Sequence, residues 1–140
     1  MTKKAVALVV MSLPERLVSL LAELKRLNLD ILTVPTCRQA RQLLRTSPPI
    51  DVVITDVTLA DGNWSDVLRE VVEFGGDTHV VVHASSPDAI LWSEVLWRGV
   101  YDMLTEPYQE QEVRNVIEGA VRAARELPQR TSELALAPAS

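Results

Sequence analysis

The chain has 140 residues, of which 47% are hydrophobic and 24% charged, a balance that supports one globular domain and argues against extensive disorder. The net charge of −5 argues against nucleic-acid binding, and a single cysteine, Cys37, excludes an intrachain disulfide. No apolar stretch in the sequence approaches the roughly 20 residues of a membrane span. The apolar run after Lys4 has no signal-peptide cleavage site behind it, so we expect a cytoplasmic protein that does not bind membranes.

Short apolar runs alternate with helical patterns along the chain. The runs are rich in β-branched residues throughout, which is typical of strands covered on both faces of a parallel sheet. In chain order, the sequence predicts strands over residues 5–10, 30–34, 51–55, 79–84 and 100–104. It predicts helices over residues 14–27, 37–45, 65–74, 87–98 and 109–125.

Several residues mark where these helices begin and end. Pro14 suits the first turn of the first helix. Ser65 and Ser86 are expected as N-caps of the third and fourth helices. Gly99 is expected to end the fourth helix, since glycine is the usual residue just beyond a helix.

The alternation of strands and helices predicts an α/β fold of five βα units, with a doubly wound, five-stranded parallel sheet. Residues 1–127 are expected to form this domain, and residues 128–140 a flexible C-terminal tail. Ligands of such sheets bind at the carboxyl ends of the strands. Asp56 follows the third strand directly and is therefore the first candidate for function. The sequence has no glycine-rich nucleotide-binding motif.

Over residues 4–125, the chain resembles the receiver domains of bacterial two-component response regulators. The resemblance is carried by Asp56, by the turn LADGNW (59–64) and by the segment RGVYDMLTEPY (98–108). It implies a flavodoxin-like receiver fold and a role in phosphorelay signal transduction. It also implies that Asp56 is the phosphoacceptor and that the bond before Pro107 is a cis peptide bond.

The chain departs from the family pattern at the other site positions. The acidic pair that helps to hold Mg²⁺ after the first strand falls on Met11 and Ser12. The Thr or Ser after the fourth strand falls on Ala84, or on Ser85 if the alignment shifts by one residue. The Lys after the fifth strand falls on Glu106. The site positions around Asp56 are therefore degenerate.

Glu106 reverses a charge that the family places beside the acceptor. At about 4 Å and an effective dielectric of 20, two like charges repel by roughly 4 kcal/mol, and we expect Asp56 and Glu106 to raise each other's pKa. We therefore expect little or no Mg²⁺-dependent phosphorylation, no cofactor and no resident metal, although Asp56 and Glu106 together are a weak candidate pair for a cation. His83 is expected as a hydrogen-bonded core residue. The alternative is a conventional phosphoacceptor that a histidine kinase phosphorylates on Asp56 with Mg²⁺.

In the family, partners bind the face formed by the fourth helix, fifth strand and fifth helix. Our candidates on this face are Trp97, Met103, which occupies the family's switch position, and Tyr108, while helical spacing predicts that Trp92 packs inward. Trp97 either anchors a partner or lies flat on its own helix. We expect a non-enzymatic domain that contacts a sensor kinase, another signalling protein or a second copy of itself. An aspartyl-phosphate hydrolase is disfavoured, since Thr58 stands where that chemistry wants a second Asp.

Overall fold

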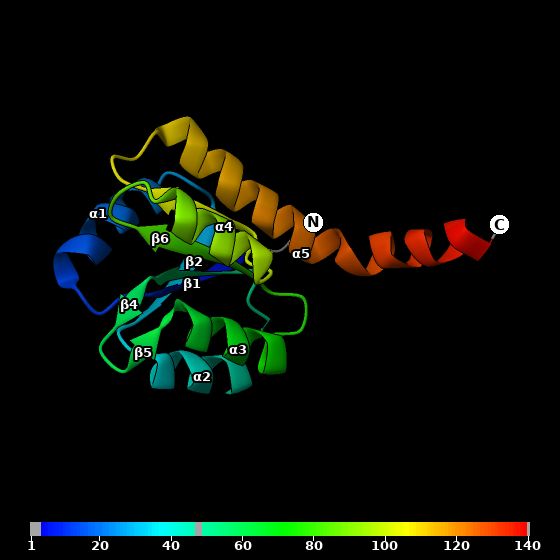
Figure 1. Cartoon of the computed structure of the whole chain (residues 1–140), viewed down its shortest axis with the longest axis horizontal. Coiled ribbons are helices and arrows are strands. Elements are labelled where there is room, and N and C mark those ends of the chain that lie inside the picture. Colours follow the sequence, from blue (N-terminus) through cyan, green and yellow to red (C-terminus); the bar gives the residue numbers. More distant parts are fainter. Residues whose placement is uncertain (1–3, 47–48, 140) are drawn as a thin grey trace.

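The computed structural model describes the backbone of residues 4–46 and 49–139, and side chains as far as Arg125. A five-stranded parallel sheet in the order β2-β1-β3-β6-β7 forms its centre (Figure 1). Its strands are β1 (Ala5–Val10), β2 (Leu29–Val34), β3 (Val52–Asp56), β6 (His79–Ala84) and β7 (Asp102–Thr105). The predicted α/β fold with a doubly wound parallel sheet is confirmed.

Five helices connect and cover these strands: α1 (Pro14–Leu24), α2 (Cys37–Thr46), α3 (Trp64–Phe74), α4 (Ala89–Trp97) and α5 (Glu110–Ala139). Between β3 and α3, a short antiparallel ladder joins β4 (Thr58–Leu59) to β5 (Gly62–Asn63). Figure 1 shows α2 and α3 on one side of the sheet and α5 running across the other. Within the described residues, no helix is long and apolar enough to cross a bilayer.

Each face of the sheet has its own hydrophobic core. Leu8, Val10 and Val53 pack with α2, α3 and α4, whereas Val9 and Ile54 pack with α1 and α5. Successive residues of one strand point to opposite faces, so both sets of side chains are buried. This two-sided burial is the reason that the central strands are mostly apolar, with polar side chains near their ends.

The N-cap of α3 is Asn63 rather than the expected Ser65. The Asn63 side chain accepts hydrogen bonds from the backbone N–H groups of Ser65 (2.9 Å) and Asp66 (3.3 Å). In return, the Asp66 carboxylate accepts the Asn63 N–H at 3.0 Å, which completes a capping box. The helix therefore begins at Trp64, where the chain leaves the β4–β5 ladder.

The expected cap of α4 was also misplaced. Asp88, not Ser86, accepts hydrogen bonds from the backbone N–H groups of Ile90 (3.1 Å) and Leu91 (3.0 Å), because its carboxylate is nearer to the helix start. As predicted, Gly99 follows the end of this helix, with a positive φ of 99° that L-residues rarely adopt.

The backbone of α5 continues to Ala139, past the end expected at residue 125. In Figure 1 its C-terminal part extends beyond the sheet. Residue 140 lies outside the described part of the chain. The domain boundary at residue 127 and the flexibility of residues 128–140 stay predictions.

Candidate functional site

Asp56 lies at the carboxyl edge of the sheet, as its place after the third strand predicted. It is the last residue of β3 and stands opposite His83 of β6 in the parallel register. Its side chain is 1% exposed, and the His83 side chain is 0% exposed. A carboxylate buried this completely requires hydrogen-bond donors or a positive charge inside the protein.

Three donors surround the Asp56 carboxylate. A guanidinium nitrogen of Arg16, Nη1, lies 3.1 Å from Oδ2 and 3.3 Å from Oδ1. The backbone N–H of Val57 donates to Oδ1 at 3.0 Å, and Nδ1 of His83 lies 3.4 Å from the same oxygen. The negative charge is therefore balanced within the chain by the cation of α1.

These contacts set the ionisation of Asp56. Burial favours the neutral acid and by itself raises the pKa, but the hydrogen bonds from His83 and Arg16 outweigh it and hold the pKa of Asp56 below its ordinary value. We expected a raised pKa because of Glu106, but the net shift is downward. The reason is that Arg16 reaches the carboxylate from α1, while the imidazole of His83 lies between the two acids.

The imidazole of His83 connects the acidic groups and an aromatic side chain. Its Nε2 atom lies 2.7 Å from the Tyr108 hydroxyl and 3.6 Å from Oε2 of Glu106. Burial, followed by the nearby charges of Glu106 and Asp56, raises the pKa of Tyr108, so its phenol stays protonated. The Tyr108 O–H can then donate to Nε2, and Nδ1–H can donate to Asp56.

The positions that correspond to the family's acidic pair are used for packing and loop contacts. Met11 is 2% exposed and packs in the core under α1 and α5. The Ser12 hydroxyl donates to the carbonyl of Pro35 at 2.6 Å and accepts the N–H of Ala60 at 2.9 Å. Neither side chain offers a carboxylate to a cation.

The remaining predicted positions lie along the same edge. Ala84 is buried at the end of β6, and Ser85 is exposed just beyond it. The bond between Glu106 and Pro107 is cis. Across the described residues, no group of three or more His, Cys, Asp or Glu side chains is arranged to hold a metal ion.

The predicted partner-surface residues separate into exposed and buried ones. Trp97 is 89% exposed on α4, on the outer side as expected. Met103 is 5% exposed and packs in the core beneath α4, so its placement on the surface was wrong. Tyr108 is half-buried, with its hydroxyl on His83. Trp92 was expected inside but is 49% exposed.

Sequence reasoning missed Arg16. It lies in the first turn of α1, two residues after Pro14, and this turn follows the loop where the family places its acidic pair. Helix N-termini that follow parallel strands lie at the carboxyl edge of the sheet. A positively charged residue in the first turn of α1 could therefore have been predicted to lie near Asp56.

No protein-family model matches the sequence. Over 99 residues, which are 71% of this chain, the sequence is 28% identical to the response regulator protein PilR of Pseudomonas aeruginosa. The matched part is 22% of that protein, so this chain spans about a fifth of its relative's length.

Solved receiver domains have the same fold. The signal receiver domain of an HD domain-containing protein from Pseudomonas fluorescens superposes with a TM-score of 0.77 at 23% identity, covering 89% of this chain and 99% of that one. The receiver domain of a putative Luxo repressor protein from Vibrio parahaemolyticus superposes with a TM-score of 0.78 at 21% identity, covering 91% of this chain and 97% of that one. The structure of an adenylate cyclase from Rhodopirellula baltica superposes with a TM-score of 0.79 at 17% identity, covering 94% of this chain and 97% of that one. The chain has the fold of response regulator receiver domains, and its sequence resembles theirs.

Proposed function

We propose that the chain is an atypical receiver domain of a phosphorelay, which acts mainly through protein–protein contact with little or no Mg²⁺-dependent phosphorylation of Asp56. The observation that carries this proposal is the ion pair between Asp56 and Arg16, with Nη1 3.1 Å from the carboxylate. The guanidinium supplies the positive charge that a divalent cation brings to a phosphorylatable aspartate.

Phosphorylation of Asp56 would have to disrupt this arrangement. A carboxylate oxygen must attack the phosphorus in line while a divalent cation bridges the acid and the phosphoryl oxygens. Both oxygens of Asp56 already contact Arg16. Met11 and Ser12 supply no further anionic ligand, and Glu106 adds a negative charge where an incoming phosphoryl group needs a positive one. Each of these features raises the barrier to transfer.

The second candidate is a conventional phosphoacceptor modified on Asp56 by a histidine kinase with Mg²⁺. One observation favours it: the positive group beside the acceptor is an arginine. Guanidinium groups bind phosphate as well as carboxylate in a bidentate manner. Arg16 could therefore move from the Asp56 carboxylate to a newly bound phosphoryl group and compensate for part of the charge of Glu106.

The partner surface that we propose is centred on α4. Trp97 is 89% exposed, Ile90 85% and Trp92 49%, so one short helix presents three large apolar side chains to solvent. Aromatic residues of this kind are common anchors of protein interfaces. The partner is a sensor kinase, another signalling protein or a second copy of the chain. The proposed role is non-enzymatic and cytoplasmic.

Intact-mass spectrometry after incubation with acetyl phosphate and Mg²⁺ tests the proposal. We expect the wild type to carry no more phosphoryl adduct than the Asp56→Asn variant. A variant that restores two family features, Ser12→Asp with Glu106→Lys, should gain the adduct, and a phosphorylatable receiver domain treated in parallel controls for the reagent. A Mg²⁺-dependent adduct on the wild type that disappears in Asp56→Asn would establish the second candidate instead.

A further inference from the structure

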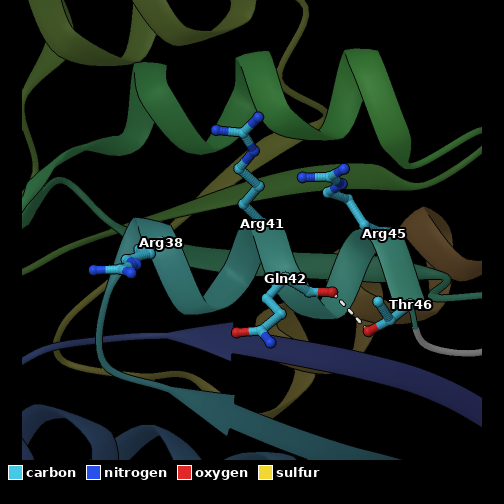
Figure 2. Close-up of a pocket in the computed structure, with 5 residues that line it drawn as sticks. All are labelled: Arg38, Arg41, Gln42, Arg45 and Thr46. Carbon is cyan, nitrogen blue, oxygen red and sulfur yellow. Dashed lines mark hydrogen bonds between the residues drawn. The ribbon is translucent and has the colours of Figure 1, made fainter.

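A positively charged surface lies on α2, away from Asp56 and α4. Arg38, Arg41 and Arg45 are exposed along this helix, and with Gln42 and Thr46 they line a hollow of about 620 Å³ (Figure 2). We call these five residues the α2 arginine groove. The helix, CRQARQLLRT, contains no acidic residue, although the whole chain has a net charge of −5.

The arginines of this groove are only partly neutralised. Arg41 lies 3.5 Å from the Glu70 carboxylate of α3, while Arg38 and Arg45 form no ion pair within the described residues. The guanidinium groups of Arg41 and Arg45 are held near the Phe74 ring, at 5.7 and 5.2 Å from its centroid. Like charges three and four residues apart destabilise an isolated helix. An anionic partner would remove this repulsion.

The arrangement of the side chains indicates the shape of that partner. Figure 2 shows Arg41 and Arg45 directed toward α3, with Arg38 pointing away at the other end of the groove. The three do not converge on one point, which disfavours a single compact anion. From Arg38 to Arg45 the helix rises about 10 Å. An elongated ligand with several negative groups spaced along it matches this length.

We propose that the α2 arginine groove docks an acidic helical segment of a partner protein. Carboxylates at positions i, i+3 and i+7 of such a segment repeat the sequence spacing of Arg38, Arg41 and Arg45. Arg38 and Arg45, which form no ion pair within the described residues, can each donate bidentate hydrogen bonds to a carboxylate, whereas Arg41 is shared with Glu70. A long polyanion is a poorer match, because it brings many further charges against an acidic protein.

This surface is independent of the function proposed for Asp56. The groove is lined by side chains of α2, and the proposed signalling surface is centred on α4. A failure of the acetyl phosphate experiment therefore leaves the α2 proposal standing, and the reverse also holds.

Fluorescence anisotropy with a labelled synthetic helix tests the proposal. The probe carries Glu at positions i, i+3 and i+7 of one face, and the control peptide carries Gln at the same positions. We expect the Glu peptide to bind, the Gln peptide to bind at least about tenfold more weakly, and the Arg38→Gln/Arg45→Gln variant to lose a similar factor. The control variant Arg114→Gln, which removes a partly exposed α5 cation, should bind as the wild type does.

Several outcomes would overturn the proposal. These are equal binding of the Glu and Gln peptides, an equal loss in Arg114→Gln, or tighter arginine-dependent binding of a single-stranded oligonucleotide. A dimer in light scattering that dissociates in Arg38→Gln/Arg45→Gln would show that a second copy occupies the groove, and this too would overturn it. Circular dichroism verifies folding. The single variant Arg38→Gln, which breaks no ion pair in the part of the chain that the structure describes, repeats the test if the double variant unfolds.

Discussion

Asp56 is a buried anion whose counter-charge comes from the same chain. Arg16 is one-third exposed, whereas Asp56 is 1% exposed, so the ion pair is shielded from solvent mainly on the acid's side. Removing only the cation leaves the carboxylate with donors from His83 and the Val57 backbone. Arg16 therefore has a measurable effect on both the stability and the ionisation of the site.

We predict that Arg16→Gln lowers the free energy of unfolding at pH 7 by about 1–3 kcal/mol, because a buried carboxylate loses its charged partner. Urea denaturation measures the change. The matched control is Arg114→Gln on α5, whose pair with Glu118 is exposed and should contribute less than about 0.5 kcal/mol. Equal effects of the two substitutions would contradict a special role for Arg16.

The lowered pKa of Asp56 predicts a loss of stability in acid. In the unfolded chain, an aspartate titrates near about 3.9. Because the folded pKa lies lower, the stabilisation is complete above the unfolded value and is lost as the pH falls toward the folded one. Urea denaturation between pH 7 and pH 3 should show a steeper acid loss in the wild type than in Asp56→Asn. If the unfolding free energy of the wild type and of Asp56→Asn falls equally with pH, the lowered pKa of Asp56 is refuted. Asp30→Asn, which removes an exposed carboxylate, serves as control.

At this scale, the sequence could predict where Asp56 lies but not what contacts it. A strand followed by an Asp places the carboxylate at the sheet edge for any βα fold. Arg16 is 40 residues away in the chain, and its contact depends on how α1 returns across the sheet. The placement of His83 between Asp56 and Glu106 likewise depends on the register of β3 and β6. Local patterns do not determine such long-range pairings.

At the scale of the elements, the strands were predictable because both faces of the sheet are covered. The N-caps of α3 and α4 were not, because several polar residues competed for each cap. Asn63 precedes Ser65 by two residues, and its geometry on leaving the β5 strand decides between them. The orientation of α4 was also hidden, since this helix is apolar on most sides and only Val95 is fully buried. Its periodicity therefore could not predict that Trp92 faces solvent.

For α3, we predict that Asn63→Ala lowers the free energy of unfolding by about 0.5–2 kcal/mol, since the side-chain oxygen that caps the N–H groups of Ser65 and Asp66 is lost. Ser65→Ala is the matched control and should cost much less, because the Ser65 backbone rather than its side chain donates to the cap. Thermal denaturation compares the two variants. The Ser65 hydroxyl accepts a hydrogen bond from Arg98 at the exposed surface, so only a small loss is expected there. No loss of stability in Asn63→Ala would contradict the capping role of Asn63.

At the scale of the whole molecule, the faces of the domain differ in what they offer to partners. The α4 face presents apolar side chains, the α2 face presents arginines, and the carboxyl edge holds an internally neutralised acid. The resemblance to receiver domains implied that functional residues lie at the carboxyl edge of the sheet and that partners bind the α4 face. The α2 groove depends on how α2 and α3 pack together, which the sequence pattern did not indicate.

We predict that Trp97→Ala changes the free energy of unfolding by less than about 0.5 kcal/mol, because the side chain is 89% exposed. Val95→Ala, on the buried side of the same helix, should cost about 2 kcal/mol. Urea denaturation distinguishes the two. If Trp97→Ala costs as much as Val95→Ala, the indole ring stabilises its own helix and does not serve as a free anchor for a partner.

The central claim is that Arg16, and not a divalent cation, neutralises Asp56. A magnesium titration followed by nuclear magnetic resonance at the amide of Val57, which donates directly to the Asp56 carboxylate, tests it most directly. We predict no saturable shift of this amide in the wild type at millimolar magnesium, and the same flat response in Asp56→Asn. A saturable shift in the wild type that is absent from Asp56→Asn would contradict the claim.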